Sequence, residues 1–456
     1  MCTVAPAMVT RLHAWAHRRS LPFWLLGALI LLSTAARLAW IAEPCRAPCL
    51  SPTDHILVFD EDYYVNAARV IAGIRPPAGA PYANAPLGVD PNSEHPQLAK
   101  LLIAGGIELF GDGPWTWRLP SVLLGTVAIL GMFGLVRAAG GSPWLGVGAA
   151  ALMAADNLLI VHSRIGTLDI SALAAMIWGA ALYLRRRPLL AGAVIGVGAC
   201  AKEVAPYVLI GLVVLELLRW YEVRSGGWAA ARRFASCAVA SAVTFIALLF
   251  VLGRIAAPYS PQTGKLVPNG PFGHVGHILT YAAHQTSPHG PQGIASYPWD
   301  WLFDVKWITY LRINPARPTL TLDQVEPAVH FIGLISPPIL LLALPGLLYA
   351  AFGVLAPRLG RRRLRASEVG RPRAGANEVG LVGLAWFLGT YLPFVAASLI
   401  ESRTSYLYYM VIVMPGIYLA VANLIARIGP RRKAVLFWMA CVLAAAVVLY
   451  PFTPLP

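Results

Sequence analysis

The apolar residues of the chain gather into long runs, and the polar residues collect between them. Eleven runs approach the roughly 20 residues that a helix needs to cross a bilayer. They cover residues 21–42, 119–137, 143–160, 168–184, 188–201, 204–220, 235–253, 330–352, 379–400, 405–426 and 434–451. Because backbone groups in lipid must be hydrogen-bonded internally, this pattern predicts an all-α polytopic membrane protein.

The composition agrees with a membrane bundle. Of the 456 residues, 57% are hydrophobic and only 12% are charged, about half the charged fraction of a soluble domain. We therefore expect one transmembrane domain over residues 1–456. The net charge of +15 is also compatible with nucleic-acid binding. The basic residues stand in short clusters between apolar runs, however, so membrane topology explains them better and no nucleic-acid partner is expected.

The basic clusters predict the orientation. With eleven spans, every cluster falls on one side, which the positive-inside rule makes cytoplasmic. The N-terminus and a basic linker at 353–378 are then cytoplasmic, and the loops 43–118 and 254–329 face outward across a plasma (inner) membrane. The first run has the basic start of a signal peptide, but its length favours an uncleaved anchor.

The two outer loops differ in pattern. Residues 62–72 and 97–110 have helical apolar spacing and predict helices that lie in the interface, with irregular chain at 75–92. Cys45 and Cys49 share the first loop and can form a disulfide if it is extracytoplasmic. The second loop is rich in Pro, Gly, His and Trp.

Three consecutive acids, Asp60, Glu61 and Asp62, follow the first span. They fit a helix N-terminus, where Asp60 can cap and acids complement the dipole. They also fit the short D-x-D pattern of metal-dependent sugar transferases, and they are candidates for a general base. A metal requirement stays open, and no cofactor is certain.

Cations recur at the outer ends of the predicted spans. They are Arg118, Arg164, Lys202 and Arg403. Ionisable groups at membrane depth usually face an interior and mark function. Interhelical pairing, for example of Arg164 with Asp169, is the alternative for any one of them. As a set, they suit an anionic phosphate. His274 and His277 have metal-ligand spacing but no evident third ligand.

The order of these motifs resembles the protein O-mannosyltransferases, glycosyltransferase family 39 of the GT-C membrane glycosyltransferases. The resemblance rests on Phe59-Asp60-Glu61, His95-Pro96-x-Leu98-x-Lys100, Trp117-Arg118, Ser163-Arg164 with Leu168-Asp169, Lys202, Ser296 to Trp301, and Arg403 with Tyr408-Tyr409. It covers nearly the whole chain and is strongest over 59–170. Gln97 and Ala99 depart from the family's His-Pro-Pro-Leu-Gly-Lys pattern, and we expect the loop 254–329 to be too short to hold the MIR domain of eukaryotic members.

The resemblance implies transfer of a sugar, most often mannose, from a polyprenyl-phosphate donor to an acceptor hydroxyl outside the membrane, with inversion. Asp60 matches the family's base. Successive helical residues do not share a face, so Glu61 is expected to do a different job, such as pairing with a cation. The four cations are expected to bind the donor phosphate, with support from His95, Lys100, Asp169, Tyr408 and Tyr409.

The acceptor stays open between Ser/Thr of a protein and a lipid or envelope glycan. A transporter is the alternative outside enzymes. Transporters usually show internal repeats and broken helices near the midplane, and we find no repeat.

Overall fold

The computed structural model describes residues 6–45, 49–223, 227–312, 330–360 and 375–451. Most of these residues are helical. The helices are α1 (Pro6–Leu38), α2 (Glu61–Ile71), α3 (Leu98–Phe110), α4 (Pro114–Ala138), α5 (Pro143–Ala155), α6 (Asn157–His162), α7 (Asp169–Leu184), α8 (Pro188–Ala201), α9 (Tyr207–Val223), α10 (Gly227–Ile255), α11 (Gly270–His284), α12 (Pro337–Leu340), α13 (Ala343–Gly360), α14 (Gly375–Glu401), α15 (Met410–Ile428) and α16 (Arg432–Val448). Five short strands complete the fold: β1 (Val89–Asp90), β2 (Ala257–Ser260), β3 (Lys265–Leu266), β4 (Ile308–Arg312) and β5 (His330–Gly333).

The helical bundle confirms the predicted fold class. Six helical segments in the described part of the chain are long and apolar enough to cross a membrane, and α5, α7 and α8 are shorter apolar helices. Every predicted span contains helix, but the count of eleven crossings stays a prediction.

Three predicted boundaries are wrong. The span expected from residue 330 opens with β5, and helix starts only at Pro337, because Ser336-Pro337-Pro338 suits a helix start and lacks backbone donors. The span 143–160 breaks at Asp156, whose side chain accepts from the backbone N–H of Leu158 and caps α6. The linker expected over 353–378 is narrower, because α13 continues to Gly360 and α14 begins at Gly375.

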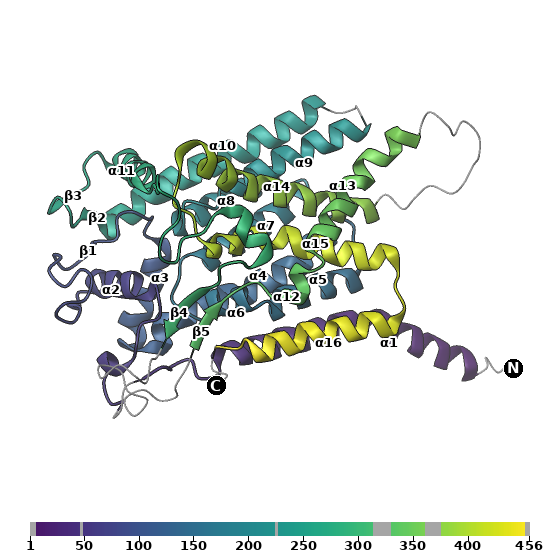
Figure 1. Cartoon of the computed structure of the whole chain (residues 1–456), viewed down its shortest axis with the longest axis horizontal. Helices are drawn as coiled ribbons and strands as arrows, with labels where there is room; N and C mark the ends of the chain where they lie inside the picture. The colour runs from purple at the N-terminus through teal and green to yellow at the C-terminus, as the bar shows by residue number, and fades with distance from the viewer. Residues whose placement is uncertain (1–5, 46–48, 224–226, 313–329, 361–374, 452–456) are drawn as a thin grey trace, which may run out of the picture.

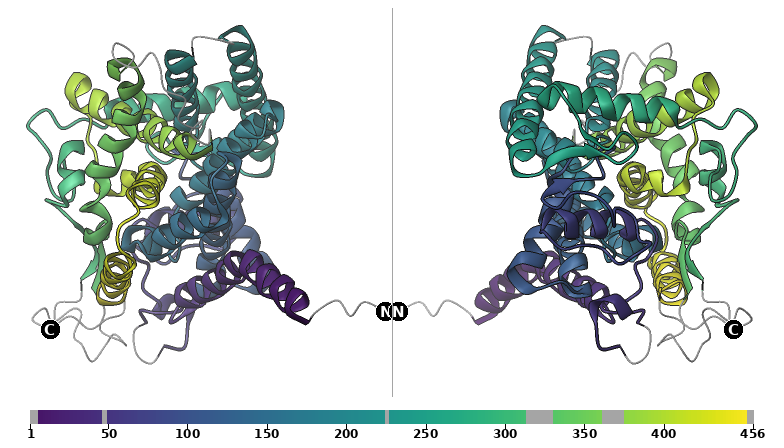
Figure 2. Two further views of the ribbon diagram at one scale, coloured as in Figure 1. Left: turned by 90° about the vertical axis from the view of Figure 1, so that its right-hand side faces the viewer. Right: turned by 90° about the vertical axis from the view of Figure 1, so that its left-hand side faces the viewer.

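The two ends of the bundle differ (Figure 1). α2, α3, α11 and the short strands gather at one end, and the C-terminal ends of α9, α13 and α15 lie at the other, where α1 also begins. The end views in Figure 2 show the blue helices of the first half on one side and the green and yellow helices of the last third on the other. The predicted outer loops therefore share one end, opposite the basic connections.

Small residues set the closest helix contact. At Gly192 of α8 an added Cβ would lie 2.1 Å from the Cys237 carbonyl oxygen of α10, and at Gly196 it would lie 2.6 Å from that of Ser241. This small-xxx-small spacing lets two backbones approach without a side chain between them. The packing brings the start of α9 and Lys202 beneath the outer loops.

α2 and α3 occupy the two segments for which interfacial helices were predicted, and strand pairing joins the two outer loops. β1 of the first loop pairs in parallel with β2 of the second, with Val89 opposite Ala257, and β3 pairs antiparallel with β2. The second loop also contains α11, and His274, His277 and His284 stand on this helix. These elements form one layer over the end of the bundle.

Candidate active site

The acidic cluster begins at a sharp turn. Phe59 has φ +59°, the left-handed region that a bulky residue rarely adopts. Its ring packs edge-on against Tyr310 and Tyr408, with centroids 4.5 and 5.7 Å away. Asp60 occupies the N-cap position of α2, but its side chain makes no capping hydrogen bond. The turn therefore leaves the Asp60 carboxylate available for another partner.

Asp60 lines a cavity beside the outer loops that also contains other titratable side chains. Its volume is about 740 Å³. Aromatic side chains form much of the wall: Tyr63, Tyr64, Tyr82, Tyr207, Tyr281, Phe394, Tyr406, Tyr408 and Tyr409. Burial among them raises the pKa of Asp60 to about 6, against the opposing effect of the Lys202 charge. The carboxylate is thus ionised at neutral pH and more basic than an ordinary aspartate.

Two of the predicted cations line this cavity. Lys202 follows the last residue of α8, and its Nζ lies 2.7 Å from Asp169 Oδ1 and 5.4 Å from the centre of the Tyr408 ring. Burial lowers the pKa of Lys202 and the carboxylates of Asp169 and Glu203 raise it, with a net upward shift. Arg403 stands half-buried before the Tyr406–Tyr409 turn and donates from Nη1 to the Ala282 carbonyl. Both side chains offer positive charge to the cavity that contains Asp60.

A second polar group of the wall comes from the segment before α3. His95 Nδ1 lies 2.9 Å from Glu203 Oε2. Glu94 accepts hydrogen bonds from Asn92 Nδ2 at 3.1 Å and from Gln262 Nε2 at 3.3 Å. His95 is therefore held at the cavity by a residue of the α8–α9 connection, as expected of a supporting residue.

Glu61 faces away from the cavity. It is fully buried, and its two oxygens accept from Arg118 Nε and Nη2, both at 2.8 Å. The same carboxylate accepts from the backbone N–H groups of Val58 and Gly166 at 2.8 and 2.7 Å. Arg118 also donates to the carbonyls of Ile41, at 2.6 Å, and of Glu43 and Ile56. This pair joins α1, the first loop, α4 and the α6–α7 turn, and the structure does not bring it to the cavity.

The remaining predicted residues hold the chain together around the site. Arg164 is buried and donates to Tyr450 Oη and to the carbonyls of Ala39 and Trp40, so it does not line the cavity either. Asp169 pairs with Lys202 and not with Arg164. Lys100 is buried and pairs with Asp90 at 2.7 Å while donating to the His95 carbonyl. These contacts position the loop that presents His95.

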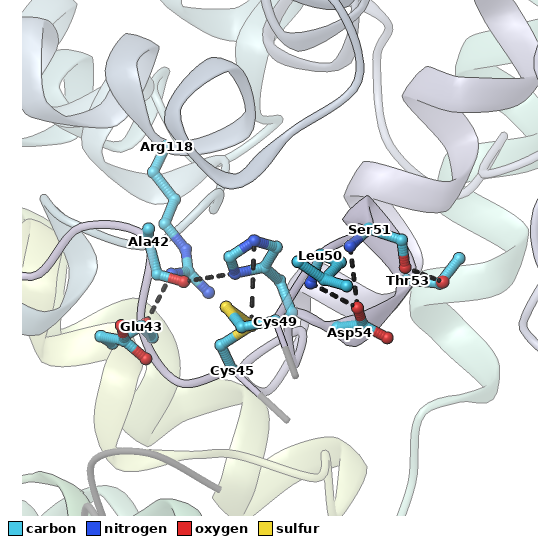
Figure 3. Close-up of a disulfide and its surroundings, with 10 residues drawn as sticks. Ala42, Glu43, Cys45, Cys49, Leu50, Ser51, Thr53, Asp54 and Arg118 are labelled. Carbon is cyan, nitrogen blue, oxygen red and sulfur yellow. Dashed lines mark hydrogen bonds between the residues drawn. A yellow bond between two sulfur atoms is a disulfide. The ribbon is translucent and has the colours of Figure 1, made fainter. Parts of the chain in front are cut away.

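The side chains of Asp60, Glu61 and Asp62 point to different places, and this decides whether they can bind one metal ion together. Asp60 lines the large cavity, Glu61 binds Arg118, and Asp62 accepts from Asn66 Nδ2 at 3.0 Å beside a separate cavity. Among the described residues, three metal-ligating side chains meet only at Cys45, Cys49 and His55. Cys45 and Cys49 form a disulfide there, the alternative that the sequence left open (Figure 3). The geometry therefore does not support a D-x-D metal site.

Several wall residues escaped the sequence analysis. Glu203 was visible as the neighbour of Lys202, but its pairing with His95 across 108 positions has no local signal. Tyr64 stands one helical turn after Asp60, which was a usable cue. Gln262 of the β2–β3 turn, Tyr281 of α11 and Glu401 of α14 reach the cavity only through the tertiary fold. His274 and His277 contact the carbonyl and the hydroxyl of Ser93 and share no third ligand.

Comparison with known proteins gives a family match and a curated relative, each over part of the chain. Residues 94–255 match the family described as dolichyl-phosphate-mannose-protein mannosyltransferase. A segment of 115 residues is 38% identical to the polyprenol-phosphate-mannose–protein mannosyltransferase of Corynebacterium glutamicum and covers 25% of this chain and 22% of that relative.

Solved structures share the fold at low sequence identity. The S. cerevisiae protein O-mannosyltransferase Pmt1–Pmt2 complex bound to the sugar donor gives a TM-score of 0.66 at 12% identity, over 94% of this chain and 89% of that chain. ArnT from Cupriavidus metallidurans bound to undecaprenyl phosphate gives 0.53 at 18% identity, over 93% and 64%.

The chain therefore shares its fold with a protein O-mannosyltransferase and with ArnT. Part of its sequence matches the mannosyltransferase family that its motifs resemble.

Proposed function

We propose that the chain transfers mannose from a polyprenyl-phosphate donor to an acceptor hydroxyl on the extracytoplasmic side of the plasma membrane. The observation that carries this proposal is the shared cavity: a raised-pKa carboxylate, Asp60, stands in one aromatic-walled space with the cations Lys202 and Arg403. The transfer needs a base for the acceptor proton and positive charge for the departing phosphate. The cavity offers both.

Asp60 is the base in this proposal. It accepts the proton of the acceptor hydroxyl as the oxygen attacks the sugar carbon, and the carbon–phosphate oxygen bond breaks on the opposite face. Direct attack inverts the sugar carbon. The polyprenyl phosphate leaves as an anion, which Lys202 and Arg403 stabilise without a general acid.

The other predicted residues support this step from a distance. His95 is held by Glu203 and stands in the wall near Asp60, where Tyr408 and Tyr409 give the sugar an aromatic surface. Glu61, Arg118 and Arg164 act as scaffold, because their hydrogen bonds go to the protein and not to the cavity. This differs from the expectation that all four cations bind phosphate, and it leaves Glu61, one of the acids considered as a general base, outside the reaction.

The orientation is part of the proposal. The large loops share one end of the bundle and the basic connections the other, so the positive-inside rule makes the cavity extracytoplasmic and the N-terminus cytoplasmic. Cysteine labelling from outside should reach a cysteine at Asn84 and miss one at Arg187. Labelling of the cysteine at position 187 and not of the one at position 84 would show that the orientation is the reverse of the one proposed.

The acceptor is proposed to be Ser/Thr of a protein, in line with the family match. A lipid or envelope-glycan acceptor is the second candidate, because the ArnT fold also matches. The test is to incubate the purified chain with polyprenyl-phosphate mannose and, separately, a Ser/Thr-rich peptide and a lipid acceptor. A mannosylated peptide supports the first candidate and a mannosylated lipid the second. Failure to consume the donor with any acceptor would reject both.

A further inference from the structure

A second outer cavity lies on the flank of the bundle, apart from the active site. Its volume is about 280 Å³, and it shares no lining residue with the larger cavity. The end of α10, the β2–β3 hairpin and the first turn of α11 form its walls, and Gln97 enters from the start of α3. Figure 1 shows α10, α11, β2 and β3 together at this corner.

Two buried side chains at this cavity have an unused hydrogen-bond acceptor. Gln97 is fully buried; its Nε2 donates to the Ala256 carbonyl at 3.4 Å, and its Oε1 has no partner among the described residues. His274 is 1% exposed, with Nε2 2.9 Å from the Ser93 carbonyl, so Nε2 carries the hydrogen and Nδ1 accepts. That Nδ1 also has no partner among the described residues. A buried acceptor left unpaired is destabilising, so both atoms favour a ligand that donates hydrogen bonds.

The imidazole of His274 is neutral under physiological conditions. Burial, with the nearby charge of Lys100, lowers its pKa to about 4. The ring therefore keeps one hydrogen, which the Ser93 carbonyl occupies, and Nδ1 stays an acceptor.

The rim of the same cavity favours an anion. Arg254 is exposed at the end of α10, with its guanidinium carbon 5.1 Å from the centre of the Phe250 ring. The 15-residue helix α11 begins at the cavity with Gly270 and Pro271, and Asn269 makes no side-chain capping bond there. A helix N-terminus and an arginine together suit a phosphate.

The approach to this rim is apolar. α10 exposes a row of large apolar side chains: Val239, Val243, Phe250, Val251 and Ile255. Because α10 is a candidate span with few buried residues, this row faces lipid chains. The cavity consequently lies where a lipid headgroup meets the end of a lipid-facing helix.

We infer that this cavity binds the headgroup of an anionic phospholipid that carries free hydroxyls, with glycerophosphate as the simplest case. The phosphate lies against Arg254 and the start of α11, and headgroup hydroxyls donate to Gln97 Oε1 and His274 Nδ1. The acyl chains follow the apolar row of α10. Gln97 departs from the proline of the resembling family, so the acceptor belongs to this chain's own sequence. The inference does not depend on the transfer reaction.

The experiment is native mass spectrometry of the full chain from nanodiscs of defined composition. Phosphatidylglycerol supplies phosphate, hydroxyls and chains; phosphatidic acid lacks the hydroxyls; phosphatidylcholine lacks both net charge and hydroxyls; soluble glycerol 3-phosphate lacks the chains. We expect one phosphatidylglycerol to be retained in preference to the other two lipids. Retention of glycerol 3-phosphate at equal affinity would identify free phosphoglycerol, and not a lipid, as the source of the shared chemistry.

Variants separate the two halves of the site. Arg254→Gln should lower phosphatidylglycerol retention about tenfold, the loss expected for one charge-assisted hydrogen bond. Gln97→Met removes the acceptor at similar volume and should abolish the preference over phosphatidic acid. Gln97→Glu keeps the shape and adds a negative charge, so it should lower retention of both anionic lipids. Lys265→Gln, an exposed cation of β3 outside the cavity, is the matched control.

Two results would overturn the inference. One is equal retention of phosphatidylglycerol and phosphatidic acid by the wild-type chain. The other is unchanged retention in Arg254→Gln and in both Gln97 variants, with Lys265→Gln alike. The first result would show that the headgroup hydroxyls do not contribute to binding. The second would show that the lipid does not bind in this cavity.

Discussion

Two neighbouring carboxylates, Asp60 and Glu61, have opposite surroundings. Glu61 is sealed in the protein and accepts four hydrogen bonds, two of them from one arginine. Asp60 caps nothing, lines a cavity of about 740 Å³ and has a raised pKa. A carboxylate whose hydrogen bonds are all made within the protein stabilises the fold, whereas one that faces a cavity is available to react. Among the cations, Lys202 and Arg403 line the same cavity as Asp60, and Arg118 and Arg164 do not.

The largest expected effect is on the scaffold side. Glu61→Gln leaves Arg118 buried beside a neutral amide, and Arg118→Met leaves Glu61 unpaired. Removing one partner of a buried pair costs about 3–5 kcal/mol. Thermal unfolding in detergent should show both variants strongly destabilised. The matched control, Glu108→Gln on the exposed face of α3, should unfold like the wild type. Two stable variants would contradict the scaffold role.

Replacing a cavity cation should weaken donor binding, whereas replacing a cation outside the cavity should change stability. Lys202→Gln and Arg403→Gln each remove a charge from the cavity and should weaken donor binding about 10- to 100-fold, since a charged hydrogen bond contributes about 1.5–3 kcal/mol. Arg164→Gln should change stability and leave donor affinity unaltered in the folded fraction. Titration of each purified variant with polyprenyl-phosphate mannose measures this. Equal donor affinity in all three variants would make Lys202 and Arg403 helix-pairing residues.

The raised pKa of Asp60 predicts a pH profile. A base must be deprotonated to act, so kcat/KM should be level above about pH 6 and fall about tenfold per pH unit below it. The direction follows from burial, which disfavours the charged carboxylate and so moves its protonation upward in pH. If kcat/KM stayed level down to pH 4, Asp60 with its raised pKa would not be the group that must be deprotonated for the reaction.

The smallest expected effect concerns the disulfide near the Arg118 anchor. Cys45 and Cys49 close a short loop, and such a loop contributes about 2 kcal/mol or less. Arg118 donates to the carbonyls of Ile41 and Glu43, which precede this loop; Figure 3 shows the contact with Glu43. The double variant Cys45→Ser, Cys49→Ser should unfold slightly earlier and keep its turnover. Loss of turnover at unchanged stability would tie the loop to the site directly.

Much of this division was accessible from sequence. Hydrophobic runs predicted the bundle, and helical spacing predicted that Glu61 would turn away from Asp60 and pair with a cation, as it does with Arg118. The runs indicate where a residue lies along a helix axis. They do not indicate which way it faces when apolar residues surround the helix, and Arg118 of α4 stands among mostly apolar residues.

The remaining contacts of the site depend on long-range packing and could not be predicted from the sequence. Arg118 and Arg164 stand at the same predicted depth as Lys202, and only the tertiary fold sends them toward the carbonyls after α1. Glu203 meets His95 through the packing of α8 against α7 and α10, which follows from glycine contacts between distant segments. The helix α11 was missed because its His, Gly and Pro content resembles loop more than helix.

The most direct test of the division between Asp60 and Glu61 is the single-turnover rate of Asp60→Asn, measured on folded protein with bound donor. Asparagine keeps the shape but cannot take a proton at neutral pH, so the rate should fall about 10²–10⁴-fold, with donor affinity and unfolding temperature unchanged. Near-normal turnover in Asp60→Asn would contradict the account, most sharply if folded Glu61→Gln were inactive, because Asp60 would then not be the base.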